Sequence, residues 1–138
     1  MKTARVFVAL VALFFSAACQ GQFAPGQPPY TLVTQYNGTI PTSTDVFRMV
    51  IPTTILCPIG LVGSYGVSVT VPTANTVFPI TKNGVSIGSL QFNAGLTTVT
   101  ATFPASITFV AGDIMRITSP ASADATLADI AYTMVCRR

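Results

Sequence analysis

The fold class is decided by the segment Val77–Ile117, which reads VFPITKNGVSIGSLQFNAGLTTVTATFPASITFVAGDIMRI. At its centre, Asn83-Gly84 separates two stretches in which apolar and polar residues alternate. An Asn-Gly pair in this setting is a strong hairpin signal, because a type I′ turn needs positive φ at both central residues. Further turn signals follow at Asn93-Ala94-Gly95 and at Ala111-Gly112-Asp113. The spacing predicts an antiparallel β-meander that continues through a last strand at Ile114–Thr118.

Further short strands are expected on both sides of this meander. Alternating or apolar patterns predict them at Tyr30–Asn37, Asp45–Ile51, Thr53–Leu61, Val67–Val71 and Leu127–Val135. Neither a helix–strand alternation nor a heptad repeat is visible, and about eight short strands at this spacing are typical of sandwiches and jelly rolls. The sequence therefore predicts an all-β fold, a single antiparallel jelly-roll-like β-sandwich over residues 30–138.

The N-terminal apolar segment, residues 1–18, is predicted to be a secretory signal or an anchor. Two positive charges in Met1–Arg5 precede the apolar run Val6–Phe15, and Ser16-Ala17-Ala18 supplies the small residues that a signal peptidase reads. The apolar run is short for a membrane span. The alternative is an uncleaved segment, either a membrane anchor or an apolar arm buried in an assembly.

Residues 19–29 are rich in proline, glycine and glutamine and are predicted to form an extended linker. Cys19 directly follows two alanines, an arrangement that resembles the lipid-attachment site of bacterial lipoproteins. We therefore regard Cys19 as a candidate for lipidation. The alternative is a mature chain that begins at Cys19 without a lipid.

The charge of the chain gives no sign of a nucleic-acid partner. Charged residues make up only 8% of the sequence, and the formal net charge is +3. Beyond residue 18, five basic residues stand against four aspartates, which leaves +1, and the basic residues are scattered. Binding to nucleic acid needs clustered Lys and Arg to neutralise phosphates, so no nucleic acid is expected to bind.

The side chains of common active sites are missing from the sequence. The chain has no histidine and no glutamate, which excludes a Ser-His-Asp or Cys-His arrangement. Its three cysteines, Cys19, Cys57 and Cys136, lack the paired spacing of a zinc site. We therefore expect no enzyme activity, no catalytic residue, no cofactor and no metal.

The aspartates leave one functional alternative open. Asp113 follows Gly112 in a predicted turn, where backbone geometry alone favours aspartate. Asp124 and Asp129 flank a predicted boundary between a loop and a strand. A calcium site at these two residues, or a glycosidase site of paired aspartates that includes Asp113, is the alternative to a structural role.

Two further features are candidates for structure or contact. Cys57 and Cys136 could form a disulfide in an exported protein, and the alternative is two buried free thiols. Leu61–Gly66 is predicted to be a glycine-punctuated loop. Tyr65 in that loop is the only aromatic residue in the predicted recognition loops that looks exposed, so it is a candidate contact for a partner.

The C-terminal part of the chain carries its most distinctive sequence. The run SPASADATLADI at Ser119–Ile130 follows FVAGD at Phe109–Asp113. With these runs, residues 44–135 resemble a β-rich module of bacteriophage virion proteins of the tail-fibre and minor structural protein type. The other matching residues are Val46-Phe47-Arg48, Leu61-Val62-Gly63-Ser64, Val77-Phe78, Lys82-Asn83-Gly84, Val85–Gly88 and Phe92-Asn93-Ala94-Gly95.

The resemblance implies a compact jelly-roll-like sandwich that serves structure or attachment in a virion. It implies a homo-oligomer, with a trimer favoured, that contacts other virion proteins and a host-surface receptor. The alternative is an exported bacterial, prophage-derived lipoprotein or periplasmic binding module, located in the periplasm or at the outer membrane. Contact with a membrane is expected only through the N-terminal segment.

Overall fold

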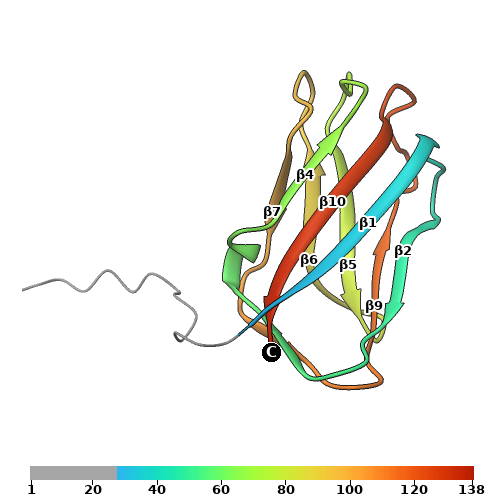
Figure 1. Cartoon of the computed structure of the whole chain (residues 1–138). Coiled ribbons are helices and arrows are strands. Elements are labelled where there is room, and N and C mark those ends of the chain that lie inside the picture. Colours follow the sequence, from blue (N-terminus) through green and yellow to red (C-terminus); the bar gives the residue numbers. More distant parts are fainter. Residues whose placement is uncertain (1–27) are drawn as a thin grey trace, which may run out of the picture.

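The computed structural model describes residues 28–138, which form two antiparallel β-sheets that lie face to face (Figure 1). The signal-like segment, Cys19 and all but the end of the linker lie outside the described residues. The strands are β1 (Pro29–Thr39), β2 (Asp45–Val50), β3 (Ile55–Cys57), β4 (Tyr65–Ser68), β5 (Thr76–Lys82), β6 (Val85–Phe92), β7 (Val99–Thr102), β8 (Ile107–Phe109), β9 (Ile114–Thr118) and β10 (Ala128–Arg137). A short 3₁₀ turn, η1 (Ile59–Leu61), joins β3 to β4. The predicted all-β, antiparallel class is confirmed.

Each sheet contains strands that are distant in the sequence. Sheet A has the order β1-β10-β3-β8, and β4 pairs with β10 beside β3. Sheet B has the order β2-β9-β5-β6-β7. Most connections therefore cross from one sheet to the other, and only β5-β6-β7 are neighbours both in the sequence and in space. Within residues 28–138 there is no helix long and apolar enough to cross a membrane.

The hairpin predicted at Asn83-Gly84 is confirmed. Lys82 pairs with Val85 across the turn, and β5 and β6 run antiparallel from there to Thr76 and Phe92. Asn83 has φ of 50° and Gly84 has φ of 85°, the signs that a type I′ turn requires.

Replacing Gly84 by alanine is expected to lower the free energy of unfolding by about 1 kcal/mol, because an L-residue with a Cβ resists positive φ. A Cβ added at Gly84 would meet no atom within 4 Å, so the loss is conformational and not steric. Urea unfolding measures it. Gly84→Asn is the control and should lose less, since asparagine tolerates this conformation. Equal losses for alanine and asparagine would contradict this explanation.

The predicted meander is correct as far as β7 and wrong beyond it. β8 pairs with β3 in sheet A, and β9 returns to sheet B, where it lies between β2 and β5. The chain leaves sheet B at Phe103-Pro104, where the ring of Phe103 is buried and Pro104 cannot donate a ladder hydrogen bond. The amide of Gly60 donates to the carbonyl of Phe103 at 2.9 Å and holds this crossing.

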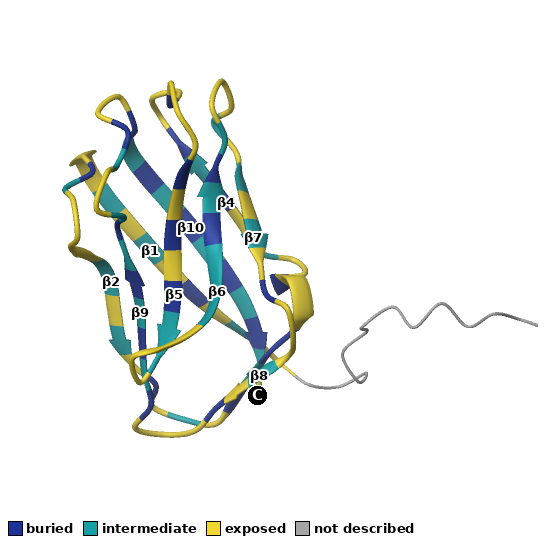
Figure 2. Cartoon of the chain, turned by 180° about the vertical axis from the view of Figure 1, so that it is seen from behind, coloured by how far each residue is buried: buried dark blue, intermediate teal, exposed yellow. Residues whose placement is uncertain are grey.

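The core lies between the two sheets. Strands alternate buried and more exposed residues, most regularly in β10 (Figure 2). Three fully buried aromatic residues, Phe78, Phe92 and Phe109, fill its centre, and the rings of Phe78 and Phe92 meet edge to face with centroids 5.8 Å apart. Alternation of this kind is what a two-layer fold requires, because each strand has one face on the core and one outside.

Tyr65 does not lie in a loop, contrary to the prediction. It is the first residue of β4, and it pairs with Thr133 of β10. The irregular segment before it is shorter than predicted, because η1 already takes up Leu61. The ring of Tyr65 is nevertheless 64% exposed, on the outer face of sheet A.

Candidate functional site

Four loops meet at one end of the sandwich, at the top of Figure 1. We call this end the loop platform; it consists of residues 40–44, 69–75, 93–98 and 119–127, which connect β1 to β2, β4 to β5, β6 to β7 and β9 to β10. The described start of the chain at Pro28 and its last residue, Arg138, lie at the opposite end, where the amide of Arg138 donates to the carbonyl of Pro28.

The carboxylate of Asp124 joins two of these loops. Its Oδ2 accepts hydrogen bonds from the amide of Thr73 at 3.0 Å, the hydroxyl of Thr73 at 2.7 Å and the amide of Ala74 at 2.6 Å. Its Oδ1 accepts from the amide of Thr126 at 2.7 Å, the amide of Leu127 at 3.2 Å and the hydroxyl of Thr126. The residue is only 8% exposed.

These hydrogen bonds explain the acidity of the group. Donors from the Thr126 hydroxyl, the Thr73 hydroxyl and nearby amides stabilise the ionised form and hold the pKa of Asp124 far below its usual range, although burial opposes the shift. Both oxygens are engaged by donors of the chain itself. A calcium ion at Asp124 would have to displace them, so the geometry favours a structural latch over the calcium alternative.

Asp129 serves a different contact. Its Oδ1 accepts a hydrogen bond from the amide of Gly38 at 2.7 Å, which ties the end of β1 to β10. Asp124 and Asp129 therefore hold separate segments. Among residues 28–138, no group of three or more acidic, histidine or cysteine side chains is placed to hold a metal ion.

Further hydrogen bonds connect the remaining loops of the platform. The side chain of Asn75 accepts from the amide of Ala94 at 2.8 Å, and the amide of Gly95 donates to the carbonyl of Pro72 at 2.9 Å. On the other side, the hydroxyl of Ser119 accepts from the amide of Thr44 at 2.9 Å. The platform is thus one bonded unit: each loop is fixed to a neighbour by groups that lie far away in the sequence.

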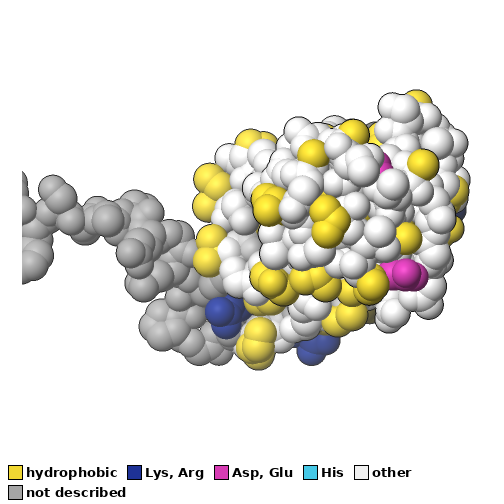
Figure 3. Space-filling model, turned by 90° about the horizontal axis from the view of Figure 1, so that it is seen from above, with side chains coloured by type: hydrophobic (Ala, Val, Ile, Leu, Met, Phe, Trp, Pro, Cys, Tyr) yellow, Lys and Arg dark blue, Asp and Glu magenta, His cyan; other side chains and the backbone are white. Residues whose placement is uncertain are grey.

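The outer surface of the platform is uncharged. Asp124 is its only ionisable residue, and that side chain is buried. Its most exposed apolar side chains are Val69, at 76%, and Leu96, at 51%. Seen from above, white and yellow atoms dominate this end, and the few acidic and basic atoms in the view lie toward its margin (Figure 3). Such a surface can make apolar contacts and hydrogen bonds from hydroxyl and backbone groups, which suits recognition of a partner.

Asp113 lies at the other end of the sandwich. Its carboxylate accepts from the amide of Val110 at 2.8 Å and from the side-chain amide of Asn83 at 2.7 Å, and it pairs with Lys82 at 3.0 Å. These three partners lower the pKa of Asp113, the Val110 amide most. Asp113 and Asp124 hold opposite ends of β5, about 20 Å apart for a strand of this length, which is too far for a carboxylate pair acting on one bond.

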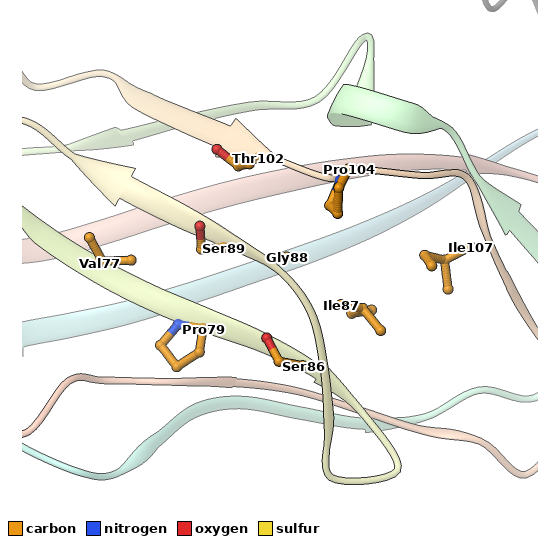
Figure 4. Close-up of a pocket in the computed structure, with 9 residues that line it drawn as sticks. All are labelled: Val77, Pro79, Ser86, Ile87, Gly88, Ser89, Thr102, Pro104 and Ile107. Atoms are coloured by element: carbon orange, nitrogen blue, oxygen red, sulfur yellow. The ribbon is translucent and has the colours of Figure 1, made fainter.

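An open depression of about 480 Å³ lies on the outer face of sheet B (Figure 4). It is lined by Val77, Pro79, Ser86, Ile87, Gly88, Ser89, Thr102, Pro104 and Ile107. The lining is mainly apolar and uncharged, so only a few hydroxyl groups could fix the orientation of a polar ligand.

Cys57 of β3 and Cys136 of β10 are joined by a disulfide. Their Cα atoms are 4.2 Å apart, the two residues are 79 positions apart in the sequence, and both are fully buried. The bond fixes the last strand to the centre of sheet A.

The sequence contained one local signal of the Asp124 latch. An aspartate followed two residues later by threonine often bonds its own backbone in a turn, as Asp124 does with Thr126. Its contacts with Thr73 and Ala74 join residues about 50 positions apart, for which the sequence carries no pattern.

Comparison with known proteins found no matching family model, no similar curated protein and no similar solved structure.

Proposed function

We propose that this chain is a non-enzymatic virion structural protein of a bacteriophage, acting in tail, fibre or capsid-surface assembly or in host attachment. The likeness of residues 44–135 to virion modules is one support. The observation that carries the proposal is the loop platform: four loops, bonded to one another and uncharged, form a rigid surface for binding a partner. Its partners are copies of the same chain, other virion proteins and a host-surface receptor.

We also propose that the sandwich is a jelly roll. Jelly rolls place eight strands in two sheets through two Greek keys and occur in viral capsid and lectin domains. The order β1-β10-β3-β8 opposite β2-β9-β5-β6 supports this assignment, because the consecutive strands of this set alternate between the sheets except at the β5–β6 hairpin, and the last strand returns beside the first. β4 and β7 then extend the two sheets on the side where Val67 bridges to Thr98.

One observation favours the alternative, an exported lipoprotein or periplasmic binding module. Disulfides persist in oxidising compartments and are rare in the cytoplasm, and Cys57–Cys136 is a buried disulfide. In this alternative the platform binds a ligand or partner outside the cytoplasm, and the chain is held by its N-terminal part.

Fractionation of the native source tests the two proposals. The virion proposal predicts that the chain bands with purified particles and that its N-terminal peptide begins at Met1, as measured by peptide mass spectrometry. Particles purified after a high-salt wash control for adhering protein. Recovery in membrane or periplasmic fractions, with residue 19 as the N-terminus and with or without a lipid, would overturn the virion proposal and support the alternative.

A further inference from the structure

Within residues 28–138, β1 is a long sheet edge whose protection is confined to its two ends, Pro29 and the irregularity between Tyr36 and Thr39. Exposed edges present unpaired backbone groups, and proteins blunt them with charges, short strands or covering segments. The other edges of the described sheets follow this rule. β2 carries the charged residues Asp45 and Arg48, and β8 has only three residues. The edge at β7 lies beside β4, because Val67 of β4 forms a bridge with Thr98, the residue before β7. β1 has eleven residues and no charge.

The register shows which backbone groups of β1 face outward. The amide of Arg138 donates to the carbonyl of Pro28, so Pro28 and Arg138 form a hydrogen-bonded pair. The next pair along the ladder is Pro29–Arg137. In an antiparallel ladder, hydrogen-bonded pairs alternate with pairs that are not hydrogen-bonded. The even-numbered residues of β1 therefore bond to β10. The amides and carbonyls of the odd-numbered residues Thr31, Val33 and Gln35 point to the free edge. Pro29 agrees with this assignment, because a proline is tolerated where its missing amide would face solvent.

We propose that this edge pairs with β1 of a second copy of the chain, antiparallel and centred on Val33. In this register Val33 lies opposite Val33 of the other copy, and Thr31 lies opposite Gln35. Each of these residues has one free donor and one free acceptor, so the pairing makes about six backbone hydrogen bonds. On the other face, Tyr30 comes opposite Tyr36, a pairing of aromatic residues that stabilises antiparallel strands.

Charge favours a second copy over an unrelated strand. The charged residues of sheet A lie at its two ends, Asp129 at the platform end and Arg137 and Arg138 at the other. A two-fold antiparallel contact brings the basic end of one copy beside the acidic end of the other. Between these ends, the outer face offers only neutral side chains, with Val33, Thr133 and Tyr65 in one row across three strands.

The inference rests on the edge alone and not on the proposed virion function. It also differs from the trimer that the resemblance implies, because a contact of β1 with itself has two-fold symmetry, whereas a trimer needs a head-to-tail contact.

Analytical ultracentrifugation of the full chain across a concentration series tests the contact. The wild type should be a dimer or a larger even-numbered oligomer. Val33→Lys should raise the dissociation constant roughly tenfold or more, because it places like charges opposite each other. Val85→Lys is the matched control, since Val85 at the β5–β6 turn and Val33 are both 68% exposed, and it should associate like the wild type.

A charge-pairing experiment separates a broken contact from a damaged fold. Val33→Glu alone should also dissociate, and an equimolar mixture of the Val33→Lys and Val33→Glu chains should form a mixed dimer. A monomeric wild type, a trimer, or unchanged association of Val33→Lys would each overturn the proposal. Recovery of particle-bound chain bears on the virion function and not on this contact, so the two proposals fail separately.

Discussion

Replacing Cys57 and Cys136 together by alanine is expected to lower the free energy of unfolding by about 4 kcal/mol. The disulfide closes a loop of 79 residues, and in the chain-entropy account a closed loop of this length removes that much freedom from the unfolded chain. The bond also fixes β10, which pairs with β1, β3 and β4 and so holds sheet A together. Urea unfolding of oxidised wild type and double variant measures the difference.

The single variants and reductant provide the controls. Cys57→Ala or Cys136→Ala alone breaks the same bond, so each should lose nearly as much as the double variant. Reduced wild type should approach the same stability. A double variant within about 1 kcal/mol of the oxidised wild type would show that the closed loop contributes little, as when the unfolded chain retains structure.

Asp124→Asn is expected to lower the melting temperature by on the order of 10 °C, since charge-assisted hydrogen bonds contribute more than neutral ones and the new amide nitrogen faces donors. In the wild type, each carboxylate oxygen of Asp124 accepts hydrogen bonds from three donors. In Asp124→Asn, one oxygen is replaced by an NH₂ group, which cannot accept, so three donors lose their acceptor. Thermal unfolding followed by circular dichroism measures the shift. Asp129→Asn is the matched control, because the side chain of Asp129 accepts a hydrogen bond from the amide of Gly38, far away in the sequence, and its replacement should shift the melting temperature much less.

The same residue predicts the pH dependence of stability. The pKa of Asp124 is lowered in the folded chain, and so is that of Asp113. A carboxyl with a depressed folded pKa contributes stability above its unfolded pKa of about 4 and loses it as the pH falls toward the folded value. The free energy of unfolding of the wild type should therefore decrease as the pH drops below about 4. In Asp124→Asn, the free energy of unfolding should decrease less steeply over the same acid range. Equal slopes for the two proteins would contradict the latch.

The local features of this fold could be predicted, because they depend on neighbouring residues. The Asn83-Gly84 turn needs only positive φ at two adjacent positions, and β5, β6 and β7 follow from alternation and short turns. The position of β9 could not be predicted in this way. Its apolar residues fit beside any strand with a buried face, and only packing of the whole core places it between β2 and β5.

The candidate site was harder to predict than the strands. Asp124 stands in a sequence run that suggested a cation site, yet its partners Thr73 and Ala74 belong to a loop about 50 positions earlier. Tyr65 shows the opposite error: glycines at Gly63 and Gly66 suggested a longer loop, whereas pairing with β10 extends β4 back to Tyr65. In both cases a contact with a distant strand or loop decides the role of the residue.

The placement of the two described chain ends opposite the loop platform has a mechanical consequence. If a partner holds the platform and the chain is pulled at Pro28, the force acts along β1, which runs between these two ends (Figure 1). The β1–β10 ladder is then sheared, and the pairs from Pro29 to Tyr36 share the load instead of opening one after another. The orientation of this single strand is therefore expected to give the domain resistance to a force applied between Pro28 and the loop platform.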